Sequence, residues 1–296
     1  MDKGKTYRHD DAFKAKARAH QFEYKELVLN DYHTEKNPQV ILSEQSARQG
    51  LIFCEEYRDL ILTKVQLKSF GVSALFSNML RSEHIPYNIF TPMEEDLNHA
   101  AALFNEIIGG GITKIYDIKI EFAGDKNKRE YLNDGTSFDV FVKYERIDGG
   151  TGGIGIEVKY TENEYSLGVK EKRDIENPKG EYQQMTTKSC YFIPNLDVSI
   201  FVKAHHLRQI WRNHLLGFAM IDKGDIQTFH HIHLYPEGNE HFHKYALPEY
   251  QKLLSEDGRK SFIELTYEKM FALLPHFFQS EKQIKWIQYL KTRYLI

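Results

Sequence analysis

Three consecutive segments in the middle of the chain alternate apolar and polar side chains with a period of two, which is typical of β-strands. These segments are 112–122, 137–144 and 153–161. Between the second and the third, residues 145–150 (ERIDGG) have the composition of a tight turn. The pattern predicts three neighbouring strands, of which the last two form a hairpin centred on Asp148.

Helical patterns precede these strands. Apolar residues at helical spacing predict a helix near 13–27, a long one over 43–67 with Ser43 as its N-cap, and a shorter one over 72–80. A further helix is predicted to start at Pro92 and to end at the glycine run 109–111.

The strands are followed by a charged stretch up to about Cys190, which has little periodicity and is predicted as a connection. A helix over 205–219 then leads to a fourth strand over 227–235, and helical patterns continue from Pro248 to the end. This order predicts an α/β fold with a mixed central sheet flanked by helices. We expect a helical region over 1–90, a core over 91–240 and a helical extension over 241–296, packed as one unit.

Composition excludes several classes of protein. The chain has 296 residues, 41% of them hydrophobic, and a net charge of 39 − 42 = −3, which excludes disorder and a polyanion partner bound by bulk positive charge. Its two cysteines form no C-x-x-C pair, which argues against a disulfide framework and a zinc ribbon. Without a signal-peptide pattern or an apolar run of about 20 residues, we expect a cytoplasmic protein with no membrane contact.

Two carboxylates on adjacent predicted strands are the most informative residues. In a hairpin centred on Asp148, paired residue numbers sum to about 296, and 139 + 157 = 296. Asp139 and Glu157 would then lie opposite each other with Cβ atoms about 5 Å apart. Lys159 lies two residues after Glu157, on the same face of its strand.

Such a pair of carboxylates is suited to binding a hard divalent cation. At that distance the two negative charges repel each other unless a cation lies between them. Mg²⁺ takes oxygen ligands and commonly binds one or two carboxylates together with phosphate oxygens, and Mn²⁺ is expected to substitute for it. A bound cation would activate water and stabilise charge on a phosphate, while Lys159 would assist the nucleophile or hold the phosphate.

Asp139 followed by Glu157-Val158-Lys159 on adjacent strands resembles the PD-(D/E)XK nuclease superfamily, in which Phe138 here replaces the proline of the motif. The restriction-endonuclease-like αβββαβ core of that superfamily matches the predicted order between about Met93 and Tyr235. The resemblance implies Asp139, Glu157 and the Val158 carbonyl as metal ligands, Lys159 as the catalytic lysine and Mg²⁺ as cofactor. The implied activity is hydrolysis of nucleic acid, by a DNA endonuclease of the restriction or defence type.

Further segments resemble bacterial restriction-endonuclease-like proteins of unassigned function. They are 73–78 (SALFSN), 156–162 (IEVKYTE), 209–213 (QIWRN) and 234–239 (LYPEGN). The superfamily often has another acidic residue on the helix before the first strand, for which Glu106 is the nearest candidate and Glu95 another. Related enzymes often form homodimers that cut two strands, although no residue here marks a dimer face.

The predicted helix after the third strand has a basic, amide-bearing face. His205, Arg208, Gln209 and Arg212 cluster on one side, and Leu207, Ile210, Trp211 and Phe218 lie on the other. These four polar residues are candidates for positioning the substrate through phosphate contacts. The alternative is an ordinary solvated face of an amphipathic helix.

Two other patterns suggest different functions. His230, His231, His233, His241 and His243 are dense enough to suggest a zinc-stabilised interaction protein, but no cysteine accompanies them, so exposed or core-edge histidines are favoured. The glycines in 149–153 lack the G-K-[ST] ending of a phosphate loop and predict a tight turn. A nuclease fold that only binds nucleic acid is a further alternative, against which the intact Asp139, Glu157 and Lys159 set argues.

Overall fold

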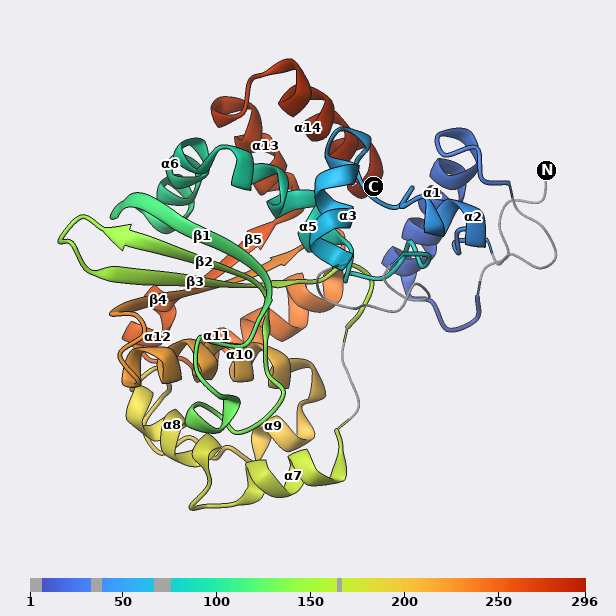
Figure 1. Ribbon diagram of the computed structural model, residues 1–296. Helices are drawn as coiled ribbons and strands as arrows, with labels where there is room; N and C mark the ends of the chain where they lie inside the picture. The colour runs from blue at the N-terminus through green and yellow to red at the C-terminus, as the bar shows by residue number, and fades with distance from the viewer. Residues whose placement is uncertain (1–6, 33–38, 67–75, 164–166) are drawn as a thin grey trace.

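A five-stranded mixed sheet with helices on both faces forms the centre of the computed structural model (Figure 1), which describes residues 7–32, 39–66, 76–163 and 167–296. The strands are β1 (Ile112–Phe122), β2 (Phe138–Arg146), β3 (Thr151–Val158), β4 (Thr228–Tyr235) and β5 (Phe262–Thr266), in the spatial order β1-β2-β3-β4-β5. The first three pair antiparallel, and β4 and β5 continue the sheet in parallel. The predicted α/β class with a mixed sheet is therefore confirmed.

The predicted hairpin register is also confirmed. Val140 pairs with Ile156 and Phe141 pairs with Gly155, so paired residue numbers sum to 296. The turn between the strands is closed by the Gly149 N–H donating to the Arg146 carbonyl at 2.9 Å, and Gly149 has a φ of 81°. This conformation favours glycine, and it explains the glycine-rich turn.

Helices before the sheet differ in part from the prediction. The structure has α1 (Ala12–Leu27), α2 (Glu44–Arg48), α3 (Arg58–Gln66), α5 (Ile85–Phe90) and α6 (Leu97–Ile108). Ser43 caps α2 as predicted, but the predicted helix over 43–67 is interrupted after α2, where Gly50 adopts a φ of 66°. Pro92 begins a short 3₁₀ turn (Pro92–Glu95), and Asp96 caps α6 instead. Residues 72–75 of the predicted helix over 72–80 lie outside the described residues, and 76–80 form turns and a bridge.

The second half of the chain contains elements that the sequence pattern did not predict. The predicted connection up to Cys190 contains α7 (Val169–Glu176) and α8 (Glu181–Ser189), followed by α9 (Ile200–Lys203) and α10 (His205–Asp222). After β4 come a π-helical turn (His241–Ala246), α11 (Leu247–Leu253), α12 (Glu256–Ser261), α13 (Tyr267–Phe277) and α14 (Glu281–Tyr294). The expectation of helices alone after Pro248 was wrong, because β5 lies between α12 and α13 and pairs with β4.

Each face of the sheet has its own hydrophobic core. Even-numbered residues of the central strands, such as Val140 and Ile156, pack with α5, α6, α13 and α14, and this core includes residues from 1–90, 91–240 and 241–296. The other face carries Phe141 and Phe229 and packs against α10. Figure 1 shows these two helical layers above and below the sheet. The division of the chain at 90 and 240 remains a prediction, although the sheet itself extends beyond 240.

No helix within the described part of the chain is long and apolar enough to cross a membrane.

A close approach between α10 and the sheet depends on a glycine. A Cβ atom on Gly217 would lie 2.0 Å from the ring of Phe229, which is buried on β4. We therefore expect Gly217→Ala to lower the free energy of unfolding by about 1–3 kcal/mol, as overpacked core substitutions do, although alanine is the better helix former.

Chemical denaturation measures this effect, with Gly135→Ala as the matched control because a Cβ at Gly135 meets no atom within 4 Å. The control should change stability by less than about 0.5 kcal/mol. Equal stabilities of the two variants would show that the contact of α10 with β4 is looser than the structure indicates.

Candidate active site

Asp139 lies where β2 and β3 end their pairing. The last pair before it joins Val140 and Ile156, which places Asp139 opposite Glu157. At this point the Asp139 side chain replaces a backbone acceptor, because its Oδ2 accepts the Val158 N–H at 2.7 Å. Asp139 is half-buried and opens into a cavity. The carboxylate is therefore held against β3 with one side toward the cavity.

Glu157 has no exposed surface and is held from two sides. Its Oε1 lies 2.6 Å from the Lys159 Nζ, and its Oε2 accepts a hydrogen bond from the Asn213 side chain on α10. A buried carboxylate is costly unless it is paired and hydrogen-bonded, and both conditions are met here.

Lys159 connects the same helix to the same strand. Its Nζ donates to the Gln209 Oε1 at 2.7 Å, and its backbone N–H donates to the Leu234 carbonyl of β4 at 2.9 Å. Its own carbonyl accepts the Tyr267 hydroxyl at 2.7 Å. The amine is thus held beside Glu157 while the backbone is tied to β4 and α13.

These contacts follow from a match between helix and strand spacing. Four residues of an α-helix advance about 6 Å, and two residues of a strand advance about 6.6 Å. Gln209 and Asn213, four residues apart on α10, therefore face Lys159 and Glu157, which lie two residues apart at the end of β3 and directly after it. Gly217, another four residues along, lies against Phe229.

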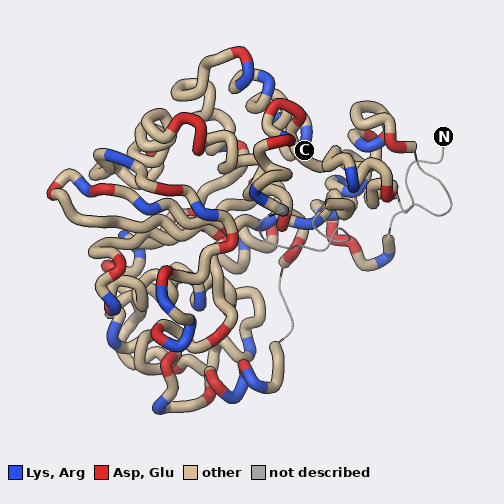
Figure 2. The backbone as a smooth tube through the Cα atoms, in the orientation of Figure 1, with Lys and Arg blue, Asp and Glu red and all other residues tan. Residues whose placement is uncertain are grey.

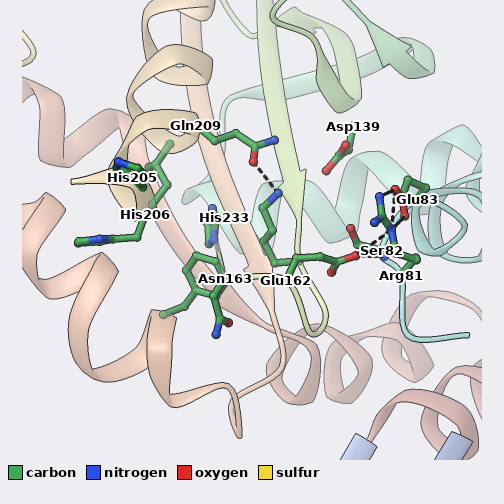
Figure 3. A pocket seen from close by; sticks show the side chains of 13 residues that line it. Arg81, Ser82, Glu83, Asp139, Glu162, Asn163, His205, His206, Gln209 and His233 are labelled. Carbon is green, nitrogen blue, oxygen red and sulfur yellow. Dashed lines mark hydrogen bonds and ion pairs between the residues drawn. The ribbon is translucent and has the colours of Figure 1, made fainter. Parts of the chain in front are cut away.

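A cavity of about 270 Å³ lies at this point, and Figure 3 shows it from close by. Asp139, Glu83 and Arg81 lie on one side, and His205, His206 and His233 on the other, with Gln209 between them. The lining residues are Arg81, Ser82, Glu83, Asp139, Lys159, Glu162, Asn163, His205, His206, Gln209, Ile210, His233 and Phe242.

The charged groups at the cavity shift one another's pKa values. Burial raises the pKa of Asp139 well above its usual range, and the Glu157 carboxylate raises it further. Burial alone would lower the pKa of Lys159, but Glu157 and Asp139 outweigh burial and raise it above its ordinary value. The lysine is therefore a cation that balances the charge of Glu157, and ionisation of Asp139 is unfavourable unless a further cation is bound.

The chain as a whole was compared with known proteins. It matches the family model of the PD-(D/E)XK nuclease superfamily over residues 8–296. The chain belongs to the PD-(D/E)XK nuclease superfamily. Comparisons with curated proteins and with solved structures give no significant match. Membership implies a phosphodiesterase with a nucleic-acid substrate, and members of this superfamily typically use Mg²⁺.

The donor set fits the Mg²⁺ that the superfamily implies. Asp139, Glu157 and the Val158 carbonyl are all oxygen donors, the kind that Mg²⁺ prefers. Among the described residues, no group of three or more histidine, cysteine, aspartate or glutamate side chains is arranged to hold a metal. Two carboxylates and one carbonyl would leave further positions to water and phosphate, as is usual for Mg²⁺.

The predicted positioning residues on α10 differ in their surroundings. His205 and Gln209 line the cavity. Arg212 is paired with Asp134, at 2.7 Å, and with Glu171 of α7. Arg208 is fully buried, and its guanidinium donates to the carbonyls of Phe201 and Val202 at 2.9 and 3.3 Å. The placement of Arg208 therefore favours a structural role instead of a contact with substrate.

Neither predicted helical acid reaches the cavity. Glu106 is exposed on α6, and Glu95 pairs at the surface with Lys282 at 2.7 Å. The sequence interpretation missed Glu83, which stands just before α5, and Glu162, whose Oε1 accepts the Ser82 N–H at 2.8 Å. Glu162 belongs to the segment 156–162 that carried the resemblance, whereas no sequence signal marks Glu83.

Two histidines of β4 are buried, which corrects the expectation of exposed or core-edge residues for these two, whereas His243 is exposed and His230 and His241 are half-buried, as expected. His231 and His233 have no exposed surface and face α10. Burial lowers the pKa of both below the ordinary value, so both rings are neutral. The absence of a metal-binding group of three such side chains in the described ranges also counts against the zinc-stabilised alternative.

The raised pKa of Asp139 predicts a specific dependence of stability on pH. Because the folded state binds this proton more tightly than the unfolded state, whose aspartates titrate near pH 4, stability falls as pH rises from about 4 through the folded pKa. Each unit of the shift costs about 1.4 kcal/mol at neutral pH. Asp139→Asn keeps an acceptor for Val158 and removes this cost, so in EDTA it should be more stable than the wild type at pH 7.5.

Denaturant unfolding at pH 4.5 and pH 7.5 measures the difference, which should be larger at pH 7.5. Added Mg²⁺ should stabilise the wild type more than Asp139→Asn. Asp148→Asn, in the exposed hairpin turn, is the control and should alter neither result. If Asp139→Asn raised the free energy of unfolding by the same amount at both pH values, the raised pKa would not belong to Asp139.

Proposed function

We propose that the protein is a Mg²⁺-dependent DNA endonuclease of the restriction or defence type, with Asp139, Glu157 and Lys159 as its catalytic set. The observation that carries this proposal is that Asp139 and Lys159 line one cavity and that Glu157 lies directly behind it, with its Oε1 2.6 Å from the Lys159 amine, while Asp139 is held against Val158 at 2.7 Å. Membership of the nuclease superfamily supports hydrolysis of phosphodiester bonds. The choice of DNA and of a restriction or defence role rests on the sequence resemblance.

Asp139, Glu157 and the Val158 carbonyl would hold the cation. When bound, Mg²⁺ supplies positive charge at the phosphate and lowers the pKa of a coordinated water. Lys159 is a cation at neutral pH, so it acts as a hydrogen-bond donor that orients the attacking water or a phosphate oxygen. Gln209 fixes the direction of that amine, and Asn213 holds Glu157 in place.

His205 and Gln209 are proposed to position the strand, because both line the cavity. Arg212 lies beside a second cavity of about 280 Å³, which is also lined by Gln209 and by residues 135–137. Its positive charge is balanced by Asp134 and Glu171, so a role in binding phosphate requires one of these pairs to open. A homodimer that cuts both strands and a cytoplasmic location remain part of the proposal.

Plasmid cleavage with Mg²⁺ or Mn²⁺ tests the activity. Asp139→Ala removes a cation ligand, and Lys159→Gln removes the positive charge while keeping a hydrogen-bonding group. Each should lower the cleavage rate by at least about 100-fold, the usual effect of losing a catalytic group. EDTA should abolish cleavage by the wild type.

Asp148→Ala and Lys143→Ala are the matched controls. Asp148 lies in the exposed turn, and Lys143 pairs with Asp125 on the surface of the hairpin. Both should cut at the rate of the wild type, and circular dichroism should show all four variants folded. If Asp139→Ala and Lys159→Gln cut as well as the controls, the site is wrong, and a wild type that binds DNA or RNA without cutting either supports the binding-only alternative.

Glu83 and Glu106 provide a second comparison. Glu83 lines the cavity and forms an ion pair with Arg81 there, so Glu83→Gln would leave the positive charge of Arg81 unbalanced near the cation, whereas Glu106 is exposed on α6. We expect Glu83→Gln to raise the Mg²⁺ concentration for half-maximal cleavage about 3-fold or more, an effect of roughly 0.7 kcal/mol. Glu106→Gln should leave it unchanged. The reverse result in the same Mg²⁺ titration would restore Glu106 as the helical acid of the site.

A further inference from the structure

His233 is a fully buried imidazole in the wall of the same cavity. It lies on β4, where it pairs in register with Glu157 of β3. Paired residues of neighbouring strands point to the same face, so His233 stands beside the Glu157–Lys159 ion pair. Figure 3 shows the ring on the side of the cavity opposite Asp139. Its exposed fraction is 0%.

Neither ring nitrogen of His233 has a hydrogen-bond partner among the residues that the structure describes. The neighbours that pack on the ring are aromatic. Phe242 lies 4.7 Å away between ring centroids, and Tyr235 lies 5.9 Å away. These aromatic contacts pack against the ring, but they provide no hydrogen-bond donor or acceptor for its nitrogens. A buried polar group without a partner costs folding free energy, and such groups occur where a ligand or water completes them.

His233 is uncharged, as expected for an imidazole next to a lysine. Burial lowers the pKa of His233 well below its usual range, and His231 and Lys159 lower it further. The ring is therefore neutral, and it carries one N–H donor and one acceptor nitrogen. A second cation beside Lys159 would be repelled, whereas a neutral ring can still donate a hydrogen bond there.

The chemistry of the cavity favours a phosphate oxygen as the ligand atom. The Lys159 amine is hydrogen-bonded to Gln209, which lies between the ring and Asp139, and the Asp139 carboxylate lies across the cavity from the ring. An anion placed between them would meet the cation on one side and N–H donors on the other. Lys159 alone would supply one such donor, and the His233 N–H would supply another.

We propose that His233 binds the substrate, its ring N–H donating a hydrogen bond to an oxygen of the nucleic-acid phosphate that enters the cavity between Asp139 and Lys159. This inference rests on the proposed function, since it uses the same cavity and the same substrate. It adds a substrate-binding residue from β4 to Asp139 of β2, Glu157 of β3 and Lys159 directly after β3.

The chain offers a matched control on the same strand. His231 is also fully buried, and neither of its ring nitrogens has a partner in the described part of the chain. Its ring stacks on Phe262 with centroids 5.4 Å apart, and it does not line the cavity. His231→Phe and His233→Phe therefore replace one buried imidazole by one aromatic ring each, and only the second changes the cavity.

Steady-state cleavage of a DNA oligonucleotide with Mg²⁺ gives the first result. His233→Phe should lower kcat/KM at least 10-fold, and His231→Phe should stay within about 3-fold of the wild type. His233→Gln, which offers an N–H donor, should recover part of the loss. Equal losses for the two phenylalanine variants, or no gain from glutamine over phenylalanine, would overturn the proposal and leave the nuclease assignment intact.

A binding measurement separates this inference from the activity. The dinucleotide TpT is titrated into ¹⁵N-histidine-labelled wild-type protein with Ca²⁺, and the ring nitrogens are followed by NMR, assigned with the two glutamine variants His231→Gln and His233→Gln. A shift of the His233 ring without a shift of His231 supports the proposal even if no nucleic acid is cut. No shift of His233, or equal shifts of both rings, overturns it.

Discussion

The arrangement of the site depends on the buried carboxylate of Glu157. A carboxylate with no exposed surface needs a cation and hydrogen-bond donors, and it finds them in Lys159 of its own segment and Asn213 of α10. Removing one partner of such a buried pair typically costs about 3–5 kcal/mol. The requirement fixes α10 against β3, and the similar advance of four helical and two strand residues brings Gln209 onto Lys159 at the same time. One electrostatic constraint therefore positions a strand, a helix and the lysine amine together.

A second constraint, the lack of side chains at two glycines, explains why the helix can lie so close to the sheet. At the other end of the shared interface, Gly217 and Gly155 leave space for the ring of Phe229, where a Cβ would lie 2.0 and 2.9 Å from the ring. Small residues at one end and hydrogen bonds at the other hold α10 against the sheet at both points. The polar contacts are thus supported by close packing, which holds side chains within the narrow tolerance that catalysis requires.

The alternation of apolar and polar residues predicted the β2–β3 hairpin, because neighbouring segments of the chain form it. The hairpin turn fixes the register of β2 and β3, so the sum of residue numbers was enough to place Asp139 opposite Glu157. β5 has only five residues, too few for its alternation to show, and it becomes a strand because β4 offers an edge. Arg208 lies on the polar face of a helical projection, yet it is buried in the fold, where its guanidinium donates to two carbonyls of α9. Contacts between distant segments decide such positions, as they do for Glu83 and His233.

Charge in this protein matters by position and not by sum. Arg212 offers a positive charge on the predicted basic face, but Asp134 and Glu171 already balance it. Figure 2 shows acidic and basic positions interspersed over both helical layers. In the proposed function, attraction for a phosphate would therefore come from inside the cavity, from Lys159 and from a cation that the carboxylates would hold. Because Glu157 is already paired with Lys159, no cation among the described residues is left to offset an ionised Asp139, and burial and Glu157 therefore raise the pKa of Asp139.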